Sequence, residues 1–195
     1  MYAVLIPIWL SQLLFFLVSL RKPRYFIAGH RSRILKHMST DDVSIVTVPP
    51  CLVLGVRRRG RYEEIPQMIM AVCDYAMKHG VELAGPPIFL MHETGAEDAM
   101  RADQEGNADM EVAWPIAAAV EDAGEFRCYS LPGGEMAMIV HRGAYHECGR
   151  TYERLYAWFA ERAIPPGGPI REVYLNDPCE VAESEILTAI YVPLA

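Results

Sequence analysis

The feature that most constrains this chain is an internal repeat. Residues 46–64 can be aligned with residues 129–147, and both copies contain an apolar, β-branched run followed by Arg-Gly-x-Tyr. Self-similarity of this kind indicates a duplicated supersecondary unit that buries its apolar face against its own copy. Three residue pairs keep a constant separation of 83 positions: Pro49 and Pro132, Gly60 and Gly143, and Tyr62 and Tyr145.

Each copy predicts the same order of elements, β-α-β-β. Apolar residues at helical spacing predict a helix in each half, and Gly80 is expected to end the first one. Residues 94–107 are polar and are expected to form a loop. The first half is predicted to contain a strand at 43–57, a helix at 62–78 and strands at 88–92 and 110–116. The second half is predicted to contain a strand at 135–141, a helix at 147–162, a strand from Ile170 and a strand at 187–194.

These elements predict an α+β fold built as a tandem β-α-β-β repeat. Two lobes are expected to be related by a pseudo-two-fold axis around a central ligand groove, because ligand sites favour such junctions. The predicted domain covers residues 43–195, with halves at about 43–120 and 125–195 and a linker between them. With 195 residues, 52% of them hydrophobic, the chain is long enough to bury one sizeable core.

Charge and cysteine usage exclude several classes of function. The net charge of −7 would repel a phosphate backbone, so we expect no direct nucleic-acid binding. The five cysteines are scattered without a CxxC pair, which argues against a zinc site or a disulfide framework and fits a reducing cytoplasm. The histidines show no HExxH or i, i+4 pattern, and no dinucleotide or nucleotide motif is present. We therefore expect no metal and no cofactor.

The N-terminal segment, residues 1–37, is apolar up to Leu20 and then basic. Met1 to Leu20 carries no charge and, as a helix, would rise about 30 Å, the thickness of a bilayer core. Arg21 and Lys22 follow at once, which would leave the rest of the chain in the cytoplasm. One interpretation is a single-span membrane anchor. The other is a translation-start artefact, since Met38, which is followed by Ser-Thr-Asp-Asp and then a strand-like run, looks like a natural start.

Glu172 is the main candidate for chemistry. In a strand, Ile170, Glu172 and Tyr174 share one face, while Arg171 and Val173 share the other. A carboxylate beside a tyrosine and an aliphatic residue could be a buried anion that binds a cation, or a general acid or base with a raised pKa. The alternative is an exposed glutamate on an edge strand.

Aromatic residues form the second signal. Trp114 and Tyr191 lie in the last predicted strand of each half, and Tyr62 and Tyr145 lie at matched positions of the repeat. Aromatic rings beside a carboxylate are suited to bind a lipophilic cation. Ordinary core packing is the alternative for each of these residues.

The motifs together resemble the GyrI-like family of small-molecule-binding domains, which includes the effector-binding domains of multidrug-responsive transcription activators. The resemblance covers about residues 43–194. It is carried by Val48-Pro49, Gly55-Val-Arg57 and Gly60-x-Tyr62 in the first half, and in the second by Pro132-Gly-Gly134, His141-Arg-Gly-Ala-Tyr145, Arg171-Glu-Val-Tyr174-Leu-Asn-Asp-Pro178 and Leu187-Thr-Ala-Ile-Tyr-Val-Pro193.

The resemblance implies a groove that binds amphipathic, often cationic or aromatic molecules, with the family's glutamate at Glu172. Because no DNA-reading module is evident, the chain resembles a stand-alone member. Our leading hypothesis is therefore a binder of amphipathic, cationic or planar aromatic molecules, with Glu172 as counter-ion. The residues expected to line the groove are Glu172, Tyr62, Trp114, Tyr145, Tyr174 and Tyr191.

Two other functions stay open at this point. Some stand-alone relatives of this type are hydrolases of cyclopropane-bearing genotoxins, in which case Glu172 and Tyr145 would be the catalytic residues. Others bind a protein partner, as gyrase inhibitors do.

Overall fold

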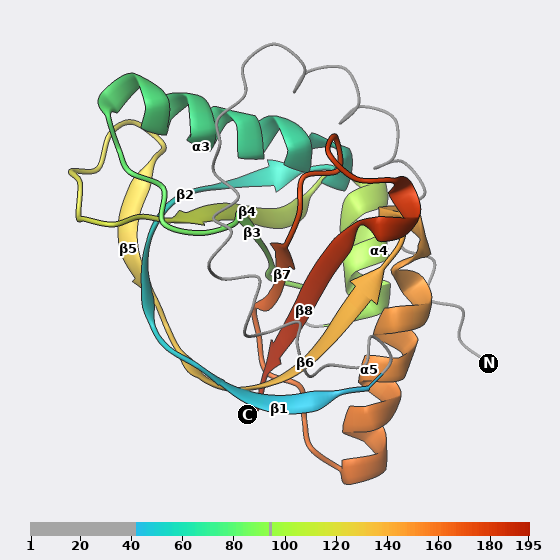
Figure 1. The fold of residues 1–195 in the computed structure, drawn as a ribbon. Helices are drawn as coiled ribbons and strands as arrows, with labels where there is room; N and C mark the ends of the chain where they lie inside the picture. Colours follow the sequence, from blue (N-terminus) through green and yellow to red (C-terminus); the bar gives the residue numbers. More distant parts are fainter. Residues whose placement is uncertain (1–41, 94) are drawn as a thin grey trace.

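The computed structural model describes residues 42–93 and 95–195. These residues form an α+β fold, as predicted, and the fold contains one eight-stranded antiparallel sheet and three α-helices (Figure 1). The strands are β1 (Ser44–Val48), β2 (Cys51–Gly60), β3 (Ile88–Met91), β4 (Ala108–Pro115), β5 (Arg127–Leu131), β6 (Gly134–Arg142), β7 (Ile170–Tyr174) and β8 (Leu187–Pro193). The helices are α3 (Ile65–His79), α4 (Ala96–Gln104) and α5 (Gly149–Arg162).

The strand order of the sheet follows the sequence repeat. The order is β1-β6-β8-β7-β3-β4-β2-β5, so each half contributes three consecutive strands and the halves meet where β7 pairs with β3. The remaining two strands are exchanged: β1 of the first half pairs with β6 of the second, and β5 of the second half pairs with β2 of the first. The two lobes are thus joined through one curled sheet.

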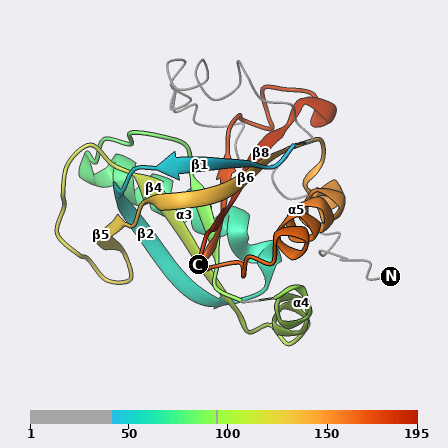
Figure 2. The ribbon, with the colours of Figure 1, turned by 90° about the horizontal axis from the view of Figure 1, so that it is seen from below.

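The exchange depends on a break between β1 and β2, in a region predicted to form one continuous strand. Residues 43–57 were expected to form one strand with Pro49-Pro50 at a bulge or edge, whereas the structure ends β1 at Val48 and begins β2 at Cys51. Proline has no N–H for the sheet ladder and a fixed φ, so the pair ends one strand and redirects the chain into the next. Figure 2 shows this change of direction between β1 and β2.

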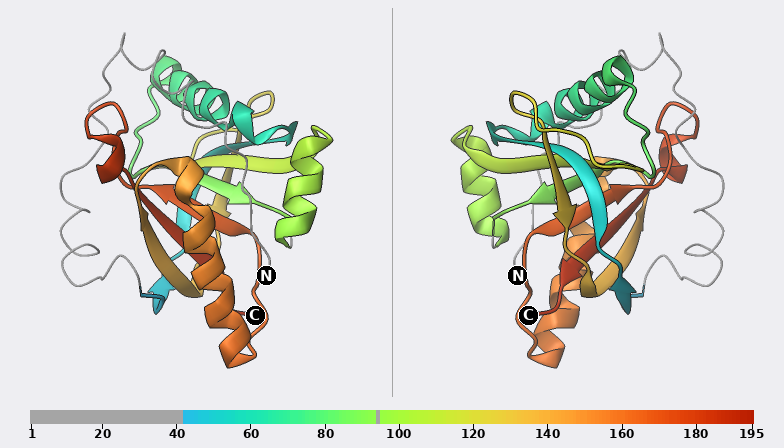
Figure 3. Two further views of the ribbon diagram at one scale, coloured as in Figure 1. Left: turned by 90° about the vertical axis from the view of Figure 1, so that its right-hand side faces the viewer. Right: turned by 90° about the vertical axis from the view of Figure 1, so that its left-hand side faces the viewer.

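The two long helices follow from their apolar spacing. The buried residues of α3 include Met68, Val72 and Ala76, at helical spacing, and those of α5 include Leu155 and Phe159, one turn apart. The helices begin at Ile65 and Gly149, slightly later than predicted, because a short 3-10 turn precedes each one. Figure 3 shows them crossing the sheet in different directions.

Gly80 ends α3 as predicted, with φ of 67° in the left-handed region. A Cβ at this position meets no atom within 4 Å, so the cost of Gly80→Ala is conformational alone. We expect the free energy of unfolding to fall by about 1 kcal/mol, measured by urea denaturation. An unchanged midpoint would show that the helix end relaxes to another conformation.

The predicted loop at 94–107 is wrong, because α4 occupies Ala96–Gln104. The helix is short, polar and buries only Ala99, so it gives almost no apolar periodicity. Its stabilising features are local: acidic Glu97 and Asp98 lie in the first turn, and Asp98 forms an i, i+3 ion pair with Arg101.

The sheet has two apolar faces. The helix face carries α3 and α4 on one side and α5 on the other, in two separate core clusters. The far face carries two further clusters built from the alternate residues of the same strands. In β7, Ile170, Glu172 and Tyr174 lie on the helix face and Arg171 and Val173 on the far face, which confirms the predicted alternation.

The N-terminal interpretations concern residues 1–37, which lie outside the described residues. Within the described part of the chain, no helix is long and apolar enough to span a membrane.

Candidate functional site

Glu172 lies where the two halves of the protein meet. In the sheet register it is directly opposite Phe89 of β3 on one side and Ile190 of β8 on the other. Phe89 belongs to the core cluster beneath α3, and Ile190 belongs to the cluster beneath α5. The carboxylate therefore sits on the helix face at the border between the two clusters.

Two tyrosine hydroxyls hold the Glu172 carboxylate. Tyr152 of α5 donates to Oε1 at 2.6 Å, and Tyr174 of β7 donates to Oε2 at 3.2 Å. The ring of Tyr145 packs edge-on against the ring of Tyr174, with 5.6 Å between the centroids. Tyr152 and Tyr174 are buried, whereas Glu172 and Tyr145 remain partly exposed, so the cluster is open to solvent at these two residues.

The charge of Glu172 has no cationic partner in residues 42–93 and 95–195. Among the described residues, no Arg, Lys or His forms an ion pair with it. Burial raises the pKa of Glu172, and the hydrogen bonds from Tyr152 and Tyr174 counteract this only in part. Burial and the nearby Glu172 charge in turn raise the pKa of Tyr145. Glu172 is therefore an anion held in place by neutral donors, without a counter-ion in the described part of the chain.

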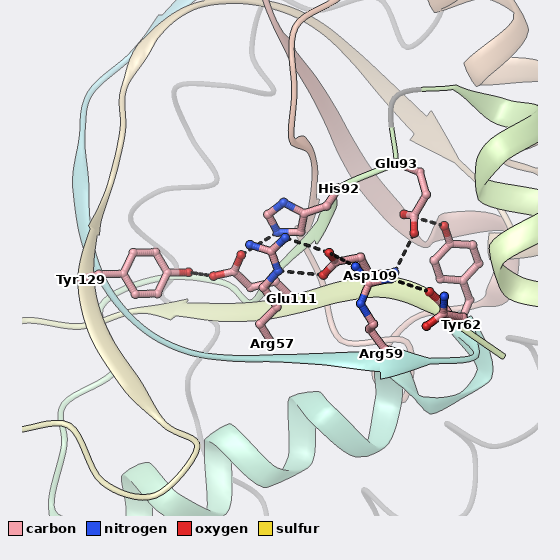
Figure 4. Close-up of polar contacts among 9 residues, drawn as sticks. Arg57, Arg59, Tyr62, His92, Glu93, Asp109, Glu111 and Tyr129 are labelled. Atoms are coloured by element: carbon pink, nitrogen blue, oxygen red, sulfur yellow. Dashed lines mark hydrogen bonds and ion pairs between the residues drawn. The ribbon is translucent and has the colours of Figure 1, made fainter.

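Tyr62 approaches Glu172 from the other half. Its ring packs edge-on against Phe89 at 5.9 Å between centroids, and the charge of Glu172 contributes to the raised pKa of its hydroxyl, after burial and the nearer Glu93. The Tyr62 hydroxyl donates to Glu93 at 3.1 Å, and its backbone N–H donates to Asp103 of α4 at 2.8 Å. Figure 4 shows Tyr62 turned towards Glu93. The helix that the sequence analysis missed thus fixes the backbone of this tyrosine.

The structure brings four of the six predicted residues together: Glu172, Tyr174, Tyr145 and Tyr62. We call these four with Tyr152 the Glu172 cluster. Trp114 shares the helix face but belongs to the core beneath α3, where its ring N–H donates to the Gly85 carbonyl at 2.6 Å. Tyr191 lies on the far face, because its neighbour Ile190 is the residue opposite Glu172.

The sequence model of one family, described as the GyrI-like small molecule binding domain, matches residues 41–195. The chain belongs to this family. Among curated proteins, none matches the chain.

Solved structures of similar fold include a protein bound to DNA and a hydrolase. The C-terminal domain of EcmrR is 18% identical, with a TM-score of 0.70, and the match covers 79% of this chain and 97% of that domain. EcmrR in a DNA complex is also 18% identical, with a TM-score of 0.69 over 78% of this chain, which spans only 57% of the longer protein. A hydrolase from Listeria innocua is 15% identical, with a TM-score of 0.57, covering 82% and 94% of the two chains. At these identities the likeness shows the fold alone.

Tyr152 is the one member of the Glu172 cluster that sequence reasoning did not assign to the site of this GyrI-like domain. Tyr152, Leu155 and Phe159 are spaced at i, i+3 and i+7 and are all buried, so the inward direction of Tyr152 was readable. The spacing does not show that its hydroxyl reaches Glu172, because that contact depends on how α5 lies on β7.

Removing the Tyr152 hydroxyl removes one hydrogen bond to Glu172. In Tyr152→Phe the ring stays in the core and one charge-assisted hydrogen bond to Glu172 is lost, which is worth about 1.5–3 kcal/mol to the ionised carboxylate. We expect the pKa of Glu172 to rise further, as measured by NMR titration of its carboxyl carbon. Tyr156→Phe on the same helix is the control, because the Tyr156 hydroxyl has no hydrogen-bond partner within the described ranges. Equal titration curves for the two variants would contradict this role.

Proposed function

We propose that this GyrI-like domain binds amphipathic aromatic cations at the Glu172 cluster. A single observation carries the proposal: a half-buried carboxylate, with no counter-ion among the described residues, is held by two tyrosine hydroxyls between two aromatic-rich cores. A cation would supply the missing charge, and the tyrosine rings offer the negative faces that attract it. The family supports small-molecule binding. The sign of the ligand's charge follows from Glu172.

The proposal is tested by calorimetric titration of the full chain with two ligands of the same shape. One is an aryl quaternary ammonium, such as benzyltrimethylammonium, and the other is its uncharged carbon isostere. We expect saturable binding of the cation and at least tenfold weaker binding of the isostere. Equal affinity for the two would mean that charge recognition plays no part and would reject the proposal.

The raised pKa of Glu172 gives the binding a pH dependence of definite sign. Only the ionised carboxylate can serve as counter-ion, so affinity is complete above the raised pKa and falls as the pH decreases through it. The fall is expected above pH 4.5, the ordinary value for this side chain. A quaternary ammonium ligand keeps its charge at every pH, so a change in its affinity arises from the protein. The measurement is affinity against pH, with Glu172→Gln as a variant that should show no such titration.

The ligand-free protein should respond to pH in the opposite direction. A carboxyl whose pKa is raised by folding contributes stability at low pH, and this contribution is lost as the pH rises through the folded pKa. Ligand-free stability and ligand affinity at the Glu172 cluster should therefore move oppositely across the same range of pH.

A second function is favoured by the same contacts. A carboxyl group with a raised pKa, in hydrogen-bond contact with tyrosine hydroxyls, is equipped to act as a general base on water. Glu172 would then take a proton from water while Tyr145 hydrogen-bonds the substrate. Incubation with cyclopropane-bearing electrophiles, followed by mass spectrometry, distinguishes the two functions: hydrolysis gives a product heavier by one water, and binding alone returns the intact ligand.

A further inference from the structure

The residue before Glu172 presents an opposite charge on the opposite face. Arg171 lies on the far face of β7, directly between Leu90 of β3 and Tyr191 of β8. Its residue surface is only 6% exposed. The apolar residues around it belong to the far-face clusters, which include Val53, Leu131, Met136 and Met138. A guanidinium, which is always charged, is thus buried on an apolar face.

Arg171 has almost no compensation for this burial. One terminal nitrogen, Nη2, donates to the Pro132 carbonyl at 2.7 Å, and Nε is buried with no hydrogen-bond partner among the residues that the structure describes. No carboxylate of the described residues forms an ion pair with it. The titratable groups near the Arg171 charge are Cys51 and Tyr129. Burial raises the pKa of both, so both are neutral near pH 7 and neither neutralises the guanidinium.

The nearest strands do not supply the missing anion. Glu111 of β4 is opposite Leu90, and Leu90 separates it from Arg171 in the register. Glu111 already accepts from His92 at 2.7 Å and from the hydroxyl of Tyr129, as Figure 4 shows. Asp109, the other carboxylate in this network, is bound by Arg57 at 2.7 Å. The carboxylates of the far face are therefore occupied by other partners, and Glu172 is on the opposite face.

A second unused donor lies beside Arg171. The hydroxyl of Tyr191, the residue directly opposite Arg171 on β8, has no hydrogen-bond partner among the described residues. Adjacent strands are about 4.8 Å apart, so the two side chains project from neighbouring points. Val173 and Tyr129 nearby remain partly exposed, which gives this part of the far face access to solvent.

We propose that the far face holds a second binding site, for a carboxylate attached to an apolar body, with Arg171 as its cationic partner and Tyr191 as a hydroxyl donor. A buried charge without a partner is costly, and a bound carboxylate would remove that cost through charge-assisted hydrogen bonds to the guanidinium. The apolar clusters around Arg171 favour an apolar carboxylate over a small hydrated oxyanion. The site is independent of the Glu172 cluster.

The experiment is a calorimetric titration of the full chain with benzoate, in which benzoate replaces an equal concentration of chloride so that the ionic strength stays constant. Inorganic phosphate is titrated in parallel. We expect saturable benzoate binding by the wild type, binding at least tenfold weaker for Arg171→Lys because lysine lacks the planar fork, and none for Arg171→Met. Arg150→Met, which removes an exposed arginine of α5, should bind as the wild type does. Glu172→Gln should also retain benzoate binding.

A purely structural role for Arg171 makes different predictions. If the side chain only holds the Pro132 carbonyl, Arg171→Met loses stability and neither protein binds benzoate. If Arg171 awaits an anion, anion-free Arg171→Met is at least as stable as the wild type, since an unpaired buried charge has been removed. Absence of saturable benzoate binding by the wild type, or tighter binding of phosphate than of benzoate, would overturn the proposal. The wild-type titration and Arg171→Lys keep the test decisive if Arg171→Met does not fold.

Discussion

Glu172→Gln is expected to weaken the binding of an aryl quaternary ammonium by roughly thirtyfold, or about 2 kcal/mol, the value of an interaction with a charged partner in a partly buried site. Glutamine keeps the size of the side chain, and its carbonyl oxygen can accept from one of the two hydroxyls, Tyr152 or Tyr174, while its NH2 group donates to the oxygen of the other. The negative charge is lost. The same variant should be at least as stable as the wild type when ligand is absent, because burial disfavours the charged form.

Glu153→Gln is the matched control for this variant. Glu153 is exposed on α5, so its replacement changes the net charge equally without touching the Glu172 cluster. Affinities are measured by calorimetry at constant ionic strength. If both variants lose affinity to the same extent, the effect arises from overall charge and Glu172 is not the counter-ion.

Gly133→Ala is expected to lower the free energy of unfolding by about 3 kcal/mol, at the upper end of the usual cost of overpacking. Gly133 lies between β5 and β6, where this connection passes the one between β1 and β2. A Cβ at Gly133 would be 2.3 Å from the Val48 carbonyl oxygen, 2.5 Å from the Pro50 nitrogen and 2.7 Å from the Pro49 carbonyl carbon. All three are backbone atoms of a proline-stiffened turn, so no side-chain rotation relieves the contact.

The control for this substitution is Gly95→Ala. Its Cβ would meet nothing within 4 Å, and its φ of −157° is extended backbone that alanine adopts freely. Chemical denaturation of both variants measures the difference. A Gly133→Ala protein as stable as the wild type would show that the two connections can separate at little cost, and the strand exchange would then not depend on their close contact.

Much of the fold could be predicted from the sequence because the repeat and the apolar spacing are properties of neighbouring residues. The separation of 83 positions relates β1 to β5 and β2 to β6. The first helix ends before Gly80 and the second ends at Arg162, as predicted. The exchange of β1 and β5 between halves could not be predicted. Strand pairing across the sheet is a long-range property, and the sequence shows only that Pro49-Pro50 disfavours a continuous strand.

The candidate site could likewise be predicted only in part, where local sequence patterns determine it. Alternation along β7 placed Glu172 and Tyr174 on one face correctly, since period-two alternation needs no tertiary information. Tyr191 was assigned to the same groove because it is aromatic and lies in the last strand. Its face depends on the register of β8 against β7, where Ile190 is the residue opposite Glu172. Register was not readable from single-strand patterns, and the role of Tyr152 required the packing of α5 on the sheet.

The central claim is that Glu172 binds its ligand through charge, and a double cycle of ligand and residue tests it most directly. Wild type and Glu172→Gln are each titrated by calorimetry with benzyltrimethylammonium and with its uncharged isostere. The account predicts that the cation loses roughly thirtyfold in affinity on substitution while the isostere changes little, which gives a coupling energy of about 2 kcal/mol between the two charges. A coupling energy near zero, with both ligands affected equally, would contradict it.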